Sequence, residues 1–137
     1  MKNLSLVSDY LKRAEDRLDA VDLLHRKKSW ANVVRESQEI VELCLKAYLR
    51  DINIEVPRIH DVSGTLQDNK GLLTGEVSKN LKKIIMISKS LRRDREIAFY
   101  GTEDLTPSEF YSEEDADQAC EYAKFIFNTV LRSVKSE

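Results

Sequence analysis

The sequence predicts an all-α protein, an up-and-down bundle of four long helices plus one short helix. The chain has 137 residues, of which 42% are hydrophobic and 34% are charged, a balance typical of one soluble domain with a sizeable core. Four Gly and two Pro are few for this length and disfavour a turn-rich all-β fold. Hydrophobic residues also recur at steps of three and four along most of the chain, which is the spacing of one helix face. We therefore expect residues 1–137 to form a single helical domain.

The first two long helices are predicted over residues 4–26 and 30–52. The hydrophobic row of the first helix ends at His25, which we expect to be either a packed, hydrogen-bonded core residue or a helix-end group that interacts with the C-terminal dipole, and not a site by itself. The second helix has hydrophobic rows on two sides, so it is either the central helix of the bundle or one that also contacts a partner subunit. A charged row runs along the same helix: Arg35, Glu39, Glu42, Lys46 and Arg50.

Two further long helices are predicted over residues 75–98 and 113–134. The connection before them should contain a short helix that begins at Asp61, because Asp is a preferred N-cap residue. Gly101 is a suitable stop for the third long helix, and a linker with Pro107 follows it. Ser112 then precedes an acidic turn, which indicates a capped start for the last helix.

Charge is distributed unevenly, although the formal net charge is only -2. Residues 79–95 are strongly basic, whereas residues 101–121 contain no Lys or Arg and many carboxylates. The two segments could simply neutralise each other. Alternatively, the basic helix could attract phosphates, because the local field matters more for that purpose than the net charge.

Several classes of protein and of site are disfavoured. No stretch approaches the roughly 20 apolar residues of a membrane span, and the N-terminus lacks a signal-like apolar core, so we expect no membrane association and a cytoplasmic location. Cys44 and Cys120 fall on hydrophobic helix faces and should be reduced core thiols. There is no Gly-rich phosphate loop and no carboxylate–His spacing of the di-iron type, so we expect no cofactor and no metal site.

The segment 36–49, GluSerGlnGluIleValGluLeuCysLeuLysAlaTyrLeu, followed by Pro57 and the pair His60-Asp61, resembles the signature of HEPN domains. The resemblance covers nearly the whole chain, including ArgAspArgGluIleAlaPheTyrGly at 93–101 and the Ala-rich last helix. It implies a HEPN-like helical bundle that forms a homodimer. Many proteins that this chain resembles are encoded beside a minimal nucleotidyltransferase, with which they form a toxin–antitoxin pair. Others are proposed to bind nucleotides.

The family that this chain resembles includes a catalytic subset of metal-independent ribonucleases. In that subset an Arg is followed a few residues later by a His. In this chain no His follows Arg92, Arg93 or Arg95, and Phe99 and Tyr100 stand where it would fall. The two histidines are His25 and His60. A Tyr, with an ordinary pKa of about 10, is a poor substitute for a group that titrates near neutral pH. Enzymatic activity is therefore left open, and the sequence favours its absence.

Three hypotheses follow from the resemblance and the residues. The first is a homodimeric module, with a nucleotidyltransferase as a possible partner, that binds a nucleotide or RNA phosphate through Arg92, Arg93, Arg95, Tyr100 and His60. The second is a ribonuclease toxin in which His60 acts with Arg95. The third is a purely structural interaction protein, in which Arg95 pairs with Glu42 or Glu39 inside the bundle.

Overall fold

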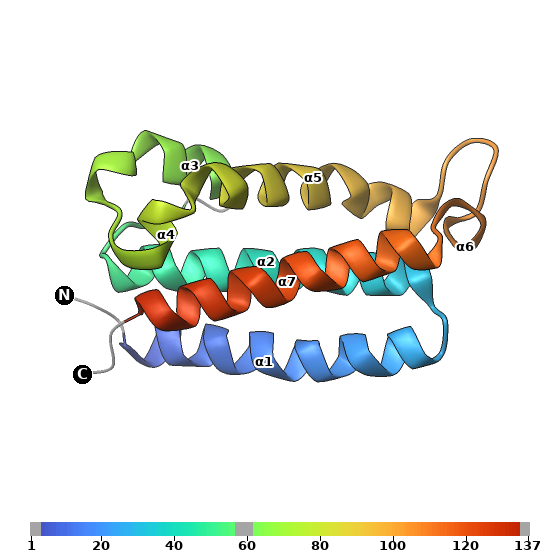
Figure 1. Cartoon of the computed structure of the whole chain (residues 1–137), viewed down its shortest axis with the longest axis horizontal. Coiled ribbons are helices and arrows are strands. Elements are labelled where there is room, and N and C mark those ends of the chain that lie inside the picture. Colours follow the sequence, from blue (N-terminus) through green and yellow to red (C-terminus); the bar gives the residue numbers. More distant parts are fainter. Residues whose placement is uncertain (1–3, 57–61, 135–137) are drawn as a thin grey trace.

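The computed structural model describes residues 4–56 and 62–134, and of Leu4, Arg95, Glu96 and Phe99 it describes the backbone only. Four long helices run up and down in turn (Figure 1): α1 (Leu4–Arg26), α2 (Trp30–Asp51), α5 (Leu81–Tyr100) and α7 (Glu113–Ser133). The described residues form helices and connections without a strand, so the all-α prediction is confirmed. None of these helices combines the length and apolar composition that crossing a bilayer requires.

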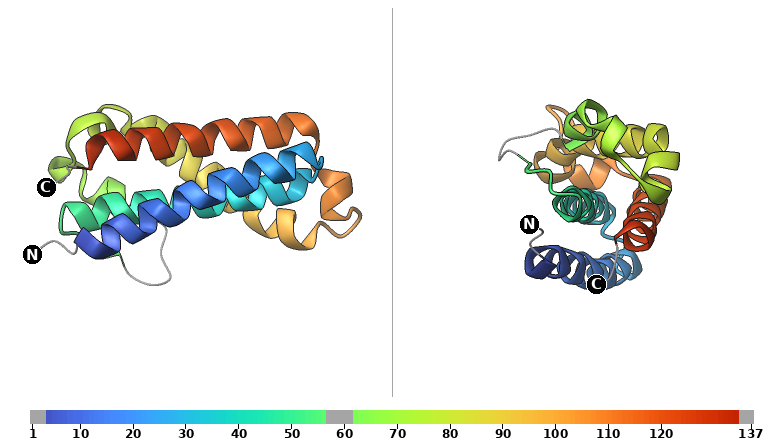
Figure 2. Two further views of the ribbon diagram at one scale, coloured as in Figure 1. Left: turned by 90° about the horizontal axis from the view of Figure 1, so that it is seen from below. Right: turned by 90° about the vertical axis from the view of Figure 1, so that its left-hand side faces the viewer.

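Helix α2 is the central helix of the bundle. It packs against α1, α5 and α7, and the end-on view in Figure 2 shows it between α1 and α5 with α7 alongside. Both of its hydrophobic rows are covered within the one chain, because Ile40 and Ala47 are as fully buried as Val41 and Leu45. Of the two alternatives for this helix, the structure supports the central position, and its burial requires no partner subunit. The charged row predicted along it is half-buried.

The prediction of one continuous helix over residues 75–98 is wrong, because the structure has two helices there, α4 (Gly75–Lys79) and α5 (Leu81–Tyr100). The break is at Asn80, whose backbone lies at φ -109° and ψ 20° and whose side-chain amide donates to the Glu76 carbonyl at 2.8 Å. A short polar side chain that bonds to the nearby backbone competes with the helical hydrogen bonds. The break lets α4 pack on α7 while α5 continues across α2.

Two capping boxes shape the segment that joins α5 to α7. The Ser112 cap was predicted and is confirmed, since Asp115 Oδ2 accepts from the Ser112 N–H at 2.9 Å and the Ser112 hydroxyl accepts from the Asp115 N–H. A second box, between Thr106 and Glu109, starts the short helix α6 (Pro107–Phe110) inside the predicted linker. The remaining short elements are α3 (Val62–Asp68) and the 3-10 helix η1 (Lys70–Leu72). The predicted cap Asp61 lies outside the described residues.

Two buried serines are expected to contribute to stability with opposite signs. The Ser133 hydroxyl accepts from the Val77 N–H at 3.2 Å and donates to the Thr129 carbonyl at 3.0 Å, joining α4 to α7. The Ser37 hydroxyl is fully buried and has no hydrogen-bond partner in the described part of the chain. Ser133→Ala should lower the free energy of unfolding by about 1–3 kcal/mol, whereas Ser37→Ala should leave it unchanged or raise it by about 1 kcal/mol.

Urea denaturation followed by circular dichroism measures both changes on the same scale. Each variant serves as the control for the other, because the substitution is identical and both sites are helical and buried. A loss of stability in Ser37→Ala as large as that in Ser133→Ala would contradict the hydrogen-bond argument.

Candidate phosphate-binding surface on helix α5

The predicted site residues divide between different sides of α5. Arg93 and Tyr100 are each 75% exposed, and Arg92 is exposed on the flank of the same helix. The backbone of Arg95 lies in α5 between the buried Leu91 and Ala98, and the inner position of its side chain stays a prediction. The side chain of Arg95 and all of His60 lie outside the described residues, so their contact with each other, and that of Arg95 with Glu42 or Glu39, stays a prediction.

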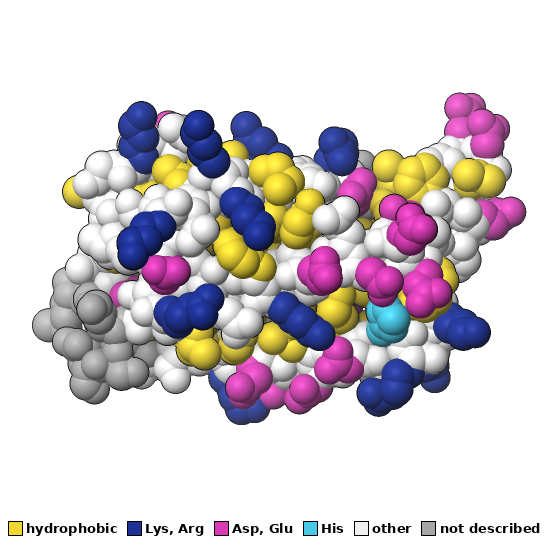
Figure 3. Space-filling view, viewed as in Figure 1, with side chains coloured by type: hydrophobic (Ala, Val, Ile, Leu, Met, Phe, Trp, Pro, Cys, Tyr) yellow, Lys and Arg dark blue, Asp and Glu magenta, His cyan; other side chains and the backbone are white. Residues whose placement is uncertain are grey.

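An exposed row of residues follows the outer face of α5. The spacing of four, three, four and seven residues places them on one helix face, and we name them the α5 stripe: Lys82, Met86, Lys89, Arg93 and Tyr100. In Figure 3 Lys and Arg side chains follow the upper part of the molecule with hydrophobic side chains between them, and others lie over the middle and the lower edge. Asp and Glu are few along the upper edge and lie near α6, over α7 and along the lower edge over α1. The stripe therefore combines three cations with an aromatic ring on one accessible face.

The cations of the stripe are largely uncommitted within the described part of the chain. Lys82 and Lys89 form no ion pair with any described side chain. Arg93 approaches a carboxylate only at long range, with 3.9 Å between its Nε and Asp94 Oδ1. A surface pair of this length contributes little to stability. Charge on the stripe is thus available to an anionic ligand.

The neighbouring Lys83 has a different role. Its Nζ lies 3.9 Å above the centre of the Phe125 ring, a cation–π contact that joins α5 to α7. Two ion pairs of the basic segment 79–95 are local, Lys79 with Glu76 at 3.6 Å and Arg93 with Asp94 at 3.9 Å.

Tyr100 owes its position at the end of α5 to Gly101. Gly101 has φ +87°, and a Cβ at this position would lie 2.6 Å from the carbonyl oxygen of Leu105. Only glycine fits such a left-handed turn against another backbone. The tight turn, closed by a 2.9 Å hydrogen bond from the Thr102 N–H to the Leu105 carbonyl, ends the helix directly after the exposed ring.

The histidine of the described chain lies away from the stripe. His25 Nε2 and Asp117 Oδ1 are 2.6 Å apart, and the His25 ring packs edge-on against Trp30 at 5.0 Å. This confirms the prediction of a hydrogen-bonded helix-end residue. With Glu113, the pair forms a group whose ligand atoms lie within 4.8 Å of one another, so these three residues could hold a cation. They join α1 to α7, however, and none of them belongs to α5.

Both cysteines are free and buried, as predicted. Burial raises the pKa of the Cys44 thiol to about 12, and burial is also the main cause of the raised pKa of Cys120. A thiol is nucleophilic only as the thiolate, so neither cysteine is suited to nucleophilic chemistry near neutral pH.

The sequence profile of the HEPN domain matches residues 7–134, from the first turn of α1 to the end of α7. The chain belongs to the HEPN domain family. Membership indicates a module with a nucleotide- or RNA-related role, in a family whose members are often ribonucleases or toxin–antitoxin components and commonly dimerise. No curated protein and no solved structure shows significant similarity to the chain.

Sequence reasoning found the basic character of this HEPN domain but missed three of the five residues of the stripe. Lys82, Met86 and Lys89 were absent from the predicted site, which concentrated on the end of the helix. Their spacing from Arg93 was the signal that could have found them, because residues at steps of three and four share a helix face. The prediction instead included Arg95, which it placed on the opposite, inner side of the same helix.

Proposed function

We propose that this HEPN domain is a homodimeric module that binds RNA phosphates along the α5 stripe. The observation that supports the proposal is the stripe itself, in which Lys82, Lys89 and Arg93 share one exposed face with the ring of Tyr100. Lys and Arg neutralise phosphates, and an exposed aromatic ring offers a stacking surface to an unpaired base. The cations and the ring are therefore complementary to the phosphates and the unpaired bases of a single-stranded nucleic acid.

The length of the stripe favours RNA over a mononucleotide. At a rise of about 1.5 Å per residue, Lys82 and Tyr100 lie roughly 27 Å apart along the helix. In B-form DNA each strand carries one phosphate per about 3.4 Å of helix axis, so a surface as long as the stripe can contact several phosphates. A single nucleotide would contact one end of this surface and leave the other cations unused.

The homodimer and a nucleotidyltransferase partner in a toxin–antitoxin-like pair are further parts of the proposal, and they rest on family membership. Light scattering of the purified chain should give twice the monomer mass of 15.8 kDa. Co-expression with a minimal nucleotidyltransferase encoded beside it should yield a complex that survives purification. A monomer at every concentration, or no neighbouring nucleotidyltransferase, would remove these parts and leave the RNA-binding part standing.

The ribonuclease alternative depends on Arg95 and His60. Acid–base cleavage of RNA needs a group that titrates near neutral pH, and the other histidine, His25, lies on α1 and contacts Asp117 of α7. His60 is thus the one histidine left for this role in the sequence. The alternative predicts cleavage that needs both residues and no metal ion.

One set of samples tests binding and cleavage together. Fluorescence anisotropy with a labelled single-stranded RNA should show binding whose affinity falls with salt, with a slope of log K against log[salt] of roughly -2 for three phosphate contacts. The same mixtures, prepared with a chelator, are then run on a denaturing gel. Intact RNA supports the binding module, whereas cleavage that is lost in both Arg95→Ala and His60→Ala would establish the ribonuclease. Absence of RNA binding, with binding of a mononucleotide or of neither, would contradict the proposal.

A further inference from the structure

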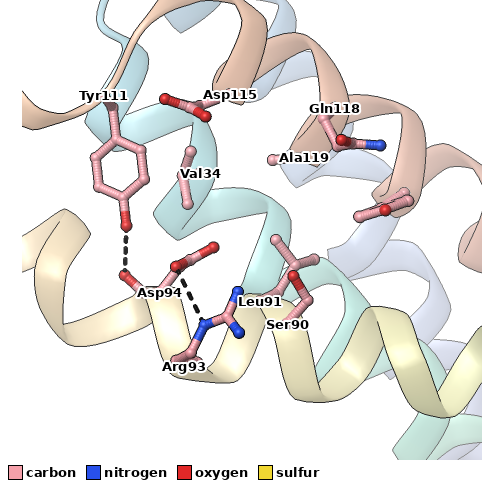
Figure 4. Close-up of a pocket in the computed structure, with 10 residues that line it drawn as sticks. Val34, Ser90, Leu91, Arg93, Asp94, Tyr111, Asp115, Gln118 and Ala119 are labelled. Carbon is pink, nitrogen blue, oxygen red and sulfur yellow. Dashed lines mark hydrogen bonds and ion pairs between the residues drawn. The ribbon is translucent and has the colours of Figure 1, made fainter.

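A hollow of about 200 Å³ opens between α5 and α7 beside the α5 stripe (Figure 4). Its lining is mainly polar, and Val34 of α2, Leu91 and Ala119 contribute the apolar part. Its volume is below the roughly 300 Å³ at which pockets for whole small molecules begin. The hollow therefore suits a single flat ring system rather than a complete nucleotide.

Two aromatic residues line this hollow. Tyr111 is buried, and its hydroxyl donates to the backbone carbonyl of Asp94 at 3.1 Å, which fixes the ring against α5. Tyr122 contributes a second, half-buried ring from α7. Flat aromatic surfaces favour the face of a planar ligand such as a nucleobase.

The carboxylate of Asp94 is the group that can select the ligand. Its side chain is 26% exposed, and Figure 4 shows it pointing into the hollow. No described group donates a hydrogen bond to it, since Tyr111 donates to the backbone and Arg93 stays 3.9 Å away. Burial raises the pKa of Asp94, with Arg93 opposing and the charge of Asp115 adding to the shift. The ionised carboxylate is therefore under-solvated and would gain from N–H donors brought by a ligand.

The other carboxylate of the hollow is already engaged. Asp115 Oδ2 accepts from both the N–H and the hydroxyl of Ser112 in the cap of α7, at 2.9 and 3.0 Å. Both carboxylates disfavour a phosphate inside the hollow, and Arg93 is the cation at its rim. A nucleotide would thus place its base inside and its phosphate outside, on the α5 stripe.

The base that fits Asp94 can be derived from hydrogen-bond patterns. A carboxylate presents two acceptors side by side and needs two adjacent N–H donors. Guanine offers this pair on its Watson–Crick edge, at N1 and the exocyclic amino group. On that edge adenine and cytosine set an acceptor beside their amino group, and uracil flanks its single N–H with carbonyls, so each would bring an acceptor against the carboxylate.

We propose that the hollow between α5 and α7 is a specificity pocket for one unpaired guanine of a bound RNA. Asp94 accepts from the N1–H and the amino group, and Arg93 holds the adjacent phosphate at the rim. Gln118, exposed at the edge of the hollow, is placed to donate to the guanine carbonyl. The inference rests on the proposed RNA binding along the α5 stripe and adds a preference for sequence to it.

Short single-stranded RNAs that differ only in their central base test the pocket. Wild-type protein should bind the guanine-containing RNA about tenfold or more tightly than the others, which is the discrimination typical of one bidentate pair. Asp94→Asn should abolish this preference and shift it toward adenine, because an amide offers one acceptor and one donor. Binding to the stripe should persist in the variant with the same dependence on salt.

Glu114→Gln is the matched control, because it removes one negative charge from the same end of the bundle without touching the hollow. It should retain the full preference for guanine. Asp94→Asn should fold at least as stably as the wild type at neutral pH, since burial disfavours the carboxylate that it removes. Thermal melting checks this point and separates a lost contact from misfolding.

Titration with the nucleoside guanosine, followed by NMR, separates failure of the pocket from failure of the proposed function. Equal, salt-dependent binding of all the RNAs would overturn the pocket and leave the stripe standing. Guanosine binding that is lost in Asp94→Asn, without any RNA binding, would support the pocket and overturn the stripe. If neither guanosine nor RNA binds, both proposals are wrong.

Discussion

Simultaneous replacement of Lys82, Lys89 and Arg93 by Glu is expected to lower the affinity of this HEPN domain for single-stranded RNA by about 100-fold or more. Three charge-assisted contacts to phosphate, each contributing at least about 1 kcal/mol, would be lost and replaced by repulsion. The slope of log K against log[salt] should also fall by about 2, because fewer counterions are released. All three side chains are exposed on a helix, and Glu is a good helix former, so the fold should be kept.

The matched control reverses three charges at the opposite edge of the bundle. Lys12, Arg13 and Lys27 are exposed on or just after α1, and their replacement by Glu changes the net charge by the same amount. Anisotropy at several salt concentrations should show near wild-type RNA binding for this control. Equal losses in the two triple variants would mean that overall charge, rather than the α5 stripe, attracts the RNA.

Replacement of Tyr48 by Ala is expected to lower the free energy of unfolding by about 3–5 kcal/mol, the largest change in stability predicted for a single residue here. Tyr48 is fully buried in the last turn of the central helix α2. Its hydroxyl accepts from the Thr74 N–H at 2.9 Å and donates to the Thr74 carbonyl at 3.3 Å. The substitution therefore leaves a cavity in the core and releases the segment that leads into α4.

Tyr48→Phe separates these two contributions, because it keeps the ring and removes the hydroxyl. Since Thr74 is exposed and water can replace the lost partner, the cost should be only about 1 kcal/mol. Urea denaturation measures both variants. A Phe variant as unstable as the Ala variant would show that the hydrogen bonds, and not the packing of the ring, dominate at this position.

The long helices could be predicted from the sequence because hydrophobic spacing and capping residues are local signals. The start and end of α1 coincide with the predicted 4–26, and Ser112 caps α7 as expected. The same kind of local signal was present but overlooked for α6, where Thr106, Pro107 and Glu109 form a capping box with Pro at the first helical position. The break at Asn80 was harder to predict, because the hydrophobic spacing continues through it from Val77 to Leu81 and Ile84.

The candidate site could be predicted from the sequence only in part. Arg92, Arg93 and Tyr100 were predicted from the resemblance, and the described structure places Arg93 and Tyr100 on one exposed face with two further lysines. Asp94 and Tyr111 were not predicted, because neither forms a motif with its neighbours in sequence. The two residues are 17 positions apart in the sequence, and the fold brings the Tyr111 hydroxyl to the backbone carbonyl of Asp94.

By itself the sequence determined the all-α class, the four long helices, the buried cysteines and the membership of the HEPN family, because periodicity, caps and family signatures are all written along the chain. The tertiary structure alone decided that α2 is covered on both sides within one chain and that α5 and α7 enclose a hollow around Asp94. Which faces become buried, and which charges lose their water, depends on how separate helices pack together. Spacing along one helix carries no record of that packing.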